Sequence, residues 1–187
     1  MTDVIVKKCS QCGAGIQINE NICGYCDSPY YVKDPYSLAN VDKLGVQKYI
    51  AMYKNDTTEE ASLSIGLCYI KLGLYDFAIK HYDKAISEAM DNSEIYYYQS
   101  IALLKGKRPF LTPLAVIKKI DEYLEVAQSL YPGNAKYYFA QAIIKADYYE
   151  KKMLRTNPTS ADLVEEANSS GLTDLDRETA QKLMNVY

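Results

Sequence analysis

The sequence is poor in histidine, lacks tryptophan and contains no motif of the common catalytic sites. Its 187 residues include one histidine, His81. A Cys–His or Ser–His arrangement could be built only through His81, and no nucleophile motif surrounds that residue. No glycine-rich phosphate loop occurs. Cys68 falls between Leu67 and Tyr69 on a predicted helix, which favours a buried, inert thiol. We therefore expect a protein that is not an enzyme.

Long apolar runs and an excess of basic residues are also missing. No stretch approaches the ~18 consecutive apolar residues of a membrane helix. The first eight residues do not resemble a signal peptide, because their apolar run is short and the basic residues follow it. We therefore expect a cytoplasmic protein. The formal net charge is −3 and the sequence pI is about 5.3, which argues against a general nucleic-acid-binding protein.

Tyrosine, by contrast, is abundant. The chain has 19 Tyr and 3 Phe, so tyrosine supplies nearly all of the large aromatic area. A tyrosine buries its ring while keeping a hydroxyl at a polar boundary, which suits both helix packing and binding grooves. We expect the tyrosine runs at 96–98, 137–138 and 148–149 to pack helices together rather than to stack on nucleobases.

Four of the five cysteines lie within eighteen residues and form two C-x2-C pairs separated by ten residues. These are Cys9, Cys12, Cys23 and Cys26. Disulfides are typical of oxidising compartments, and nothing indicates export. Zn²⁺ prefers four soft ligands in a tetrahedron, and two C-x2-C turns supply four thiolates. Because all four ligands come from the protein, no coordination position stays open for chemistry. The sequence therefore predicts one structural zinc ion.

The segment around these cysteines resembles the short zinc ribbon found at the ends of many bacterial and archaeal proteins. Residues 16–18 alternate as a strand does, residues 19–21 can turn, and Ile22 leads back to the second cysteine pair. We expect residues 1–36 to form a small β-hairpin zinc ribbon. Three basic residues stand there against four acidic ones. Because phosphate binding needs clustered positive charge, we favour a structural or protein-contacting ribbon over one that docks on nucleic acid.

After Asp34-Pro35, apolar residues recur at helical spacing, and residues 59–92 resemble a tetratricopeptide (TPR) repeat. That family has a period of 34 residues folded as helix–turn–helix. The matching small and aromatic residues are Gly66, Tyr69, Gly73, Tyr75, Ala78, Tyr82 and Ala85. Met90 and Ser62 depart from the proline and tryptophan that are usual at their positions. A weaker copy spans 93–132, with eight extra residues around 106–113, and a third helix opens at Asn134.

The resemblance implies that residues 37–187 form a mostly α, TPR-like α-solenoid of about three helical hairpins, closed by a last helix over 174–186. Its first helices would present a concave face to a partner protein. We expect an apolar peptide or helix to bind there. The predicted partner-binding residues are Lys71, Tyr97, Ile101, Leu104, Lys105, Phe139 and Ile143.

Several alternatives stay open at this point. The last helix could fill the groove itself through Leu175, Leu183 and Met184. The insertion with Lys105, Lys107, Arg108 and Phe110 is either a second contact or a solvated loop, whereas the acidic cluster around Asp121 is expected to be a solvated face. The predicted function is a non-enzymatic adaptor that binds partner proteins, with no membrane and no small-molecule substrate. The alternative is a factor whose ribbon docks on nucleic acid or a ribonucleoprotein.

Overall fold

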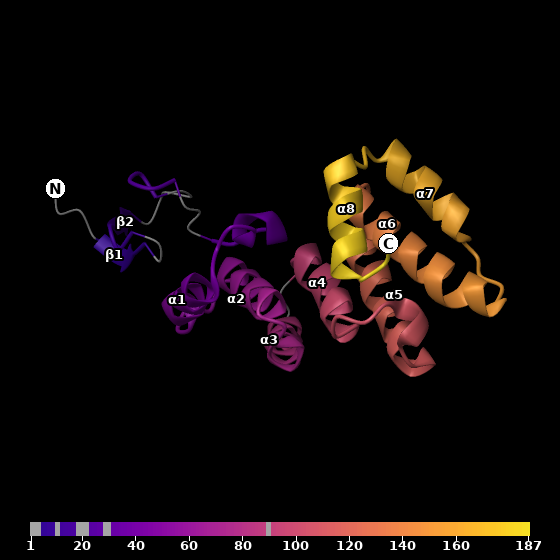
Figure 1. The fold of residues 1–187 in the computed structure, drawn as a ribbon, viewed down its shortest axis with the longest axis horizontal. Coiled ribbons are helices and arrows are strands. Elements are labelled where there is room, and N and C mark those ends of the chain that lie inside the picture. The colour runs from indigo at the N-terminus through magenta and orange to yellow at the C-terminus, as the bar shows by residue number, and fades with distance from the viewer. Residues whose placement is uncertain (1–4, 10–11, 18–22, 28–30, 89–90) are drawn as a thin grey trace. The chain divides into compact units, whose positions relative to one another are not determined.

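The computed structural model describes residues 5–9, 12–17, 23–27, 31–88 and 91–187. Over these residues the protein is mostly helical, and neighbouring helices pack on one another (Figure 1). The chain divides into two compact units, 1–81 and 82–187, and the division falls within helix α3. The predicted domain boundary after residue 36 stays a prediction.

The first unit begins with two short antiparallel strands on either side of the first cysteine pair. Strand β1 (Ile5–Lys8) pairs with β2 (Gly15–Gln17), so that Lys8 lies opposite Gly15. The tight turn between them is closed by the Cys9 amide, which donates to the Ala14 carbonyl at 2.7 Å. Gly13 in this turn has a φ of +75°, a conformation that favours glycine. The predicted hairpin between the two cysteine pairs depends on residues 18–22, which lie outside the described residues.

Three helices follow in this unit, each introduced by a turn. They are preceded by the short 3₁₀ helix η1, and the bounds are η1 (Pro35–Leu38), α1 (Lys43–Tyr53), α2 (Glu59–Lys71) and α3 (Tyr75–Ser87). Helix α1 packs against α2, and the rings of Tyr31 and Tyr49 both stack on Tyr53, with centroids 5.2 and 6.1 Å away. Ser64 on α2 donates to the Val32 carbonyl at 3.1 Å. The chain that follows the cysteines is thereby attached to α1 and α2.

The turn between α2 and α3 requires a glycine. Gly73 has a φ of +71°, and the Leu74 amide donates to the Tyr69 carbonyl at 2.9 Å. This is the left-handed helix ending in which glycine avoids the steric cost of a Cβ. The ring of Phe77 on α3 then stacks on Tyr69 of α2, with centroids 5.6 Å apart.

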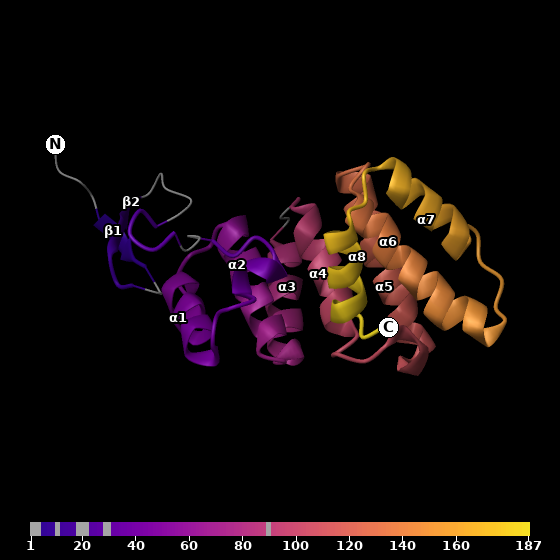
Figure 2. The ribbon, with the colours of Figure 1, turned by 45° about the horizontal axis from the view of Figure 1, so that its top comes forward.

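The described part of the second unit consists of helices joined by short connections, and it includes two 3₁₀ turns. In order they are α4 (Ser93–Leu103), η2 (Pro109–Leu111), α5 (Leu114–Leu130), α6 (Ala135–Ile144), the π-helical turn η3 (Lys145–Tyr149), η4 (Glu150–Lys152), α7 (Ser160–Ser169) and α8 (Asp174–Leu183). Helix α4 packs on α5, and α6 packs on α5, α7 and α8 (Figures 1 and 2).

Helices α2, α4 and α6 begin at regular intervals along the sequence. Their N-cap residues are Thr58, Asn92 and Asn134, each accepting a backbone N–H through its side chain. The intervals are therefore 34 and 42 residues. Eight residues after each cap stands a small buried residue, namely Gly66, Ser100 and Ala142. Small residues at such positions allow a second helix to approach closely.

Within the part of the chain that the structure describes, no helix combines the length and the apolar character needed to cross a membrane.

Candidate metal centre and partner-binding residues

The two C-x2-C turns bring the four cysteines of the predicted zinc site together. Cys9 directly follows β1, and the turn after Cys23 is closed by the Asp27 amide, which donates to the Cys23 carbonyl at 2.9 Å. The Sγ atoms of Cys9 and Cys26 are 3.5 Å apart, and those of Cys12 and Cys23 are 3.7 Å apart. All four sulfur atoms lie within 4.8 Å of one another. Each pair therefore contributes two ligands to one cluster.

These distances fit a metal ion better than disulfides. A disulfide would bring two sulfurs to about 2.05 Å. A tetrahedral ion with metal–sulfur bonds of about 2.3 Å places its sulfurs about 3.8 Å apart. Cys9 and Cys23 are buried, with Ala14 and Tyr31 packed against them, while Cys12 is exposed. The cluster could thus hold one ion with two of its ligands shielded from solvent.

The raised pKa of the Cys12 thiol shows that a bound cation would have to supply the positive charge that favours the thiolate. A hydrogen bond from the Ala14 backbone lowers the pKa of the Cys12 thiol, but desolvation and the neighbouring Cys26, Cys23 and Cys9 thiols outweigh it and raise the pKa to about 12. Without a cation, the Cys12 thiol therefore holds its proton. A bound metal would provide the positive charge that favours thiolates, so binding would release protons and would weaken in acid.

The predicted partner-binding residues separate into buried and exposed groups. Lys71 and Lys105 are exposed, and the Lys71 ammonium donates to the Ala39 carbonyl at 3.4 Å. The five apolar members are all at most 7% exposed: Tyr97, Ile101, Leu104, Phe139 and Ile143. The apolar part of the predicted groove is therefore not an open surface in this structure.

Helix α8 accounts for part of this burial. It packs on α6, and the Arg177 guanidinium carbon lies 5.2 Å from the centre of the Phe139 ring. Met184 and Ala180 are almost completely buried, whereas Leu175 is 55% exposed. Of the two alternatives that the sequence left open, the packing of α8 on α6 agrees with a last helix that covers part of the first-helix face. Of the three residues expected to fill the groove, Met184 is buried, Leu183 is half-buried and Leu175 is exposed.

Two expectations about single residues have different outcomes. Cys68 is buried as expected, and burial raises the pKa of its thiol to about 12. The expectation that Asp121 lies on a solvated face is wrong. Asp121 is 8% exposed, lies 3.0 Å from the Lys145 ammonium and accepts the Tyr149 hydroxyl at 2.7 Å. The Asp121 carboxylate can be buried because the ammonium of Lys145, 24 residues further along the chain, pairs with it.

The tyrosine runs behave as expected where the structure buries them. Tyr97, Tyr98, Tyr137 and Tyr148 are each at most 5% exposed. The Tyr97 ring contacts both Tyr98 and Tyr137, with centroids 4.8 and 5.3 Å away. These rings pack α4 against α6 and are closed to stacking with a nucleobase.

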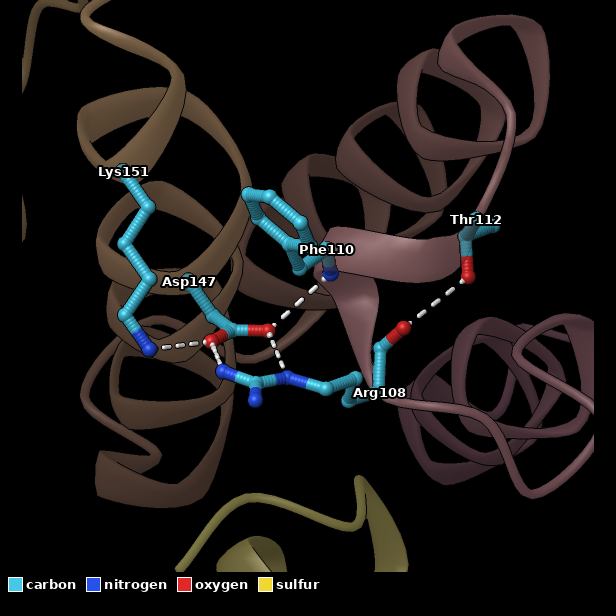
Figure 3. A network of polar contacts seen from close by, with 5 residues as sticks. All are labelled: Arg108, Phe110, Thr112, Asp147 and Lys151. Carbon is cyan, nitrogen blue, oxygen red and sulfur yellow. Dashed lines mark hydrogen bonds and ion pairs between the residues drawn. The ribbon is translucent and has the colours of Figure 1, made fainter.

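The buried carboxylate of Asp147 joins the insertion before α5 to the turns η3 and η4 that follow α6. Asp147 is 1% exposed and accepts hydrogen bonds from the Arg108 guanidinium, the Phe110 amide at 3.0 Å and the Lys151 ammonium at 2.7 Å (Figure 3). Sequence reasoning missed this network. The available signal was a lone acid in an apolar helix, together with the basic residues of the insertion.

Replacing Asp147 with Asn is expected to lower the free energy of unfolding by about 2 kcal/mol at pH 7. Burial opposes ionisation of Asp147, but the hydrogen bonds from Arg108, Lys151 and the Phe110 amide lower its pKa from 3.8 to about 2. Each unit of pKa difference is worth about 1.4 kcal/mol. Because the pKa is lower in the folded state, this stabilisation is complete above about pH 4 and is lost as the pH falls towards 2.

Urea unfolding at pH 7, 5 and 3 would measure this effect. The difference between Asp147→Asn and the parent should be equal at pH 7 and 5 and smaller at pH 3. The exposed Glu122→Gln variant is the matched control and should stay within about 0.5 kcal/mol of the parent. A difference that grows towards pH 3 would contradict this account of the network.

Comparison with protein-family models, curated proteins and solved structures found no match to this chain.

Proposed function

We propose that this protein is a non-enzymatic cytoplasmic adaptor, in which a TPR-like helical solenoid binds partner proteins and a zinc ribbon provides a second contact module. The observation that carries the proposal is the regular start of α2, α4 and α6, with caps at residues 58, 92 and 134 and a small buried residue eight positions later. The first interval equals the 34-residue TPR period, and the second exceeds it by the eight residues expected from the insertion.

The metal in this proposal is a structural Zn²⁺ ion. Four thiolates are the soft ligand set that zinc prefers, and the spacing of the sulfurs is close to that of a tetrahedral zinc site. With four protein ligands, no position is left for water or a substrate. Zinc would therefore hold the cysteine segment in its fold, and its chemistry would be limited to that task.

The helices then supply the contact surface. Repeats of this kind stack helical hairpins and use their extended faces for recognition. In the second unit, α4 with α5 and α6 with α7 form two such packed pairs. Because the apolar face of α4 and α6 is buried, a partner would bind either the remaining exposed surfaces or that face after α8 moves.

Affinity capture from the native host would test the adaptor function. The intact tagged chain should retain at least one host protein at a constant molar ratio, and nuclease treatment should leave that ratio unchanged. A variant with Cys9→Ser and Cys12→Ser would show whether the cysteine segment contributes a contact. If nothing is retained above an unrelated tagged chain, the adaptor function is wrong. If nuclease removes the retained proteins, the function is docking on nucleic acid or a ribonucleoprotein.

A further inference from the structure

Asp147 fixes two segments of the second unit against each other, residues 105–111 and 147–155. Its carboxylate holds Arg108 and the Phe110 amide on one side and Lys151 on the other (Figure 3). Because the carboxylate is buried and fully hydrogen-bonded, the two segments form one surface of defined shape rather than two loose ends. We call it the Phe110 surface; its members are Lys107, Arg108, Phe110, Leu111, Lys152 and Met153.

Large apolar side chains are exposed on this surface. Leu111 is 65% exposed, Met153 is 94% exposed and Phe110 is 38% exposed. Lys152 links the two segments, since its ammonium lies 5.0 Å from the centre of the Phe110 ring and 3.8 Å from that of Tyr148. Met153 follows directly, in a left-handed conformation that ends the helix. Exposed apolar side chains on two segments that are held together favour an interaction site, and methionine adapts to varied partners.

The same segments are strongly basic within an acidic protein. Residues 105–111 and 147–155 contain six Lys or Arg and two acidic residues, whereas the whole chain has a net charge of −3. Both acids are already engaged: Asp147 as described, and Glu150 by the amide and hydroxyl of Ser160 at 2.9 and 2.8 Å. Among the described residues, Lys107 and Lys152 form no ion pair. Their charge is left for a partner to complement.

From these observations we infer that the Phe110 surface binds an acidic, amphipathic segment of a partner protein. This inference rests on the proposed adaptor function and specifies where a partner binds and by what chemistry. Carboxylates of the segment would pair with Lys107, Arg108 and Lys152, and its apolar side chains would cover Phe110, Leu111 and Met153. Charge complementarity at such a site speeds association and sets specificity.

The apolar members favour a peptide over nucleic acid. A phosphate backbone gains nothing from contact with Leu111 or Met153. In addition, the basic surface is small and the rest of the chain carries the negative excess, which repels any polyanion that extends beyond it. A short segment with alternating acidic and apolar side chains satisfies both features of the surface.

The test uses the full, metal-loaded chain, immobilised and exposed to a pool of 12-residue peptides built from Asp, Glu, Leu, Phe and Ser. A matched pool contains Asn and Gln in place of the acids. We expect the acidic pool to be retained at least tenfold better than the amide pool, and less well in 300 mM than in 50 mM NaCl because salt screens exposed charges. Lys152→Glu should reduce retention by roughly fivefold or more, and Leu111→Ser should reduce it as well.

The control is Lys80→Glu, which makes the same change of charge at an exposed residue of α3 and should leave retention unchanged. Circular dichroism would verify that each variant is folded. The inference is overturned if Lys152→Glu and Lys80→Glu retain equal amounts of peptide. It is also overturned if a 12-nucleotide oligothymidine displaces the acidic peptides, since the surface would then bind polyanions.

This experiment separates the inference from the adaptor function on which it rests. If Lys152→Glu and Leu111→Ser capture the same host protein as the parent chain, the adaptor stands and the partner binds elsewhere. If the parent chain captures no host protein and yet retains the acidic pool through Lys152, the acidic-segment site stands and the adaptor function is wrong.

Discussion

A Cys23→Ser chain is expected to lose its zinc and the fold of its cysteine segment while keeping its helices. Cys23 is 1% exposed and lies 3.7 Å from Cys12, so its loss removes a shielded ligand. Among the described residues of this segment, the apolar cluster is small: Ala14, Cys26 and Tyr31 pack against the buried pair Cys9 and Cys23. Metal binding would then supply most of its folding free energy, on the order of 10 kcal/mol. No helix contributes a ligand, so the helical signal should persist.

Elemental analysis of chelator-free preparations would give one zinc per parent chain and close to none per Cys23→Ser chain. Limited proteolysis should cut the variant within residues 1–33 and spare the helices. Cys68→Ala provides the matched control, since it removes the fifth cysteine, which is buried in α2 and lies outside the cluster. That variant should keep its zinc. Parent protein that is folded and reduced but free of zinc would show the metal assignment to be wrong.

The cysteine cluster could be predicted from sequence because its determinants are local. A C-x2-C turn brings two sulfurs close together independently of the rest of the chain. One contact between two such turns is then enough to form the cluster. The strand pairing was harder to predict. Alternation over residues 16–18 predicted a hairpin that returns through Ile22, which lies outside the described residues. The pairing that the structure describes is that of β2 with β1, which precedes the first cysteine pair.

The buried charges and the covered groove could not be predicted, because they depend on contacts between distant residues. Asp121 is buried through Lys145, 24 positions away, and Asp147 through Arg108, 39 positions away. Helical periodicity identifies an apolar face but does not say which element will cover it. Tyr97 and Phe139 therefore had the same pattern that an open groove would give, but the structure buries both of them. Tyr97 packs against Tyr98 and Tyr137, and Phe139 lies beside Arg177 of α8.

Removing residues 172–187 is expected to leave a folded but clearly less stable protein with newly exposed apolar surface. Helix α8 is short, and its start is stabilised locally by Thr173, whose hydroxyl donates to Asp176 at 2.6 Å. Its fully buried side chains are Ala180 and Met184. The packing of α4 on α5 and of α6 on α5 and α7 does not involve α8, and these contacts would hold the remaining helices together.

Two point variants test whether the buried side chain of Met184, rather than α8 as a whole, contributes to stability. Met184→Ala should cost about 2–5 kcal/mol, because the side chain is completely buried. Leu175→Ala removes a similar side chain that is 55% exposed on the same helix, and it should change stability by less than about 0.5 kcal/mol. Equal losses for the two variants would contradict the placement of Met184 in the core.

Thermal unfolding and binding of an apolar dye would measure the truncated chain, which should melt earlier and bind more dye as Phe139 and Ile143 lose their cover. Complete unfolding would mean that α8 is an essential part of the core, and the predicted groove would then not exist as a binding face.

The informative comparison is between the amounts of host protein that the intact and the truncated chains capture. If the truncated chain captures more of it, the face of α4 and α6 is a binding site that α8 occupies in the unbound protein. If capture is unchanged, the partner binds outside this face, where the Phe110 surface offers exposed charge and exposed apolar side chains together.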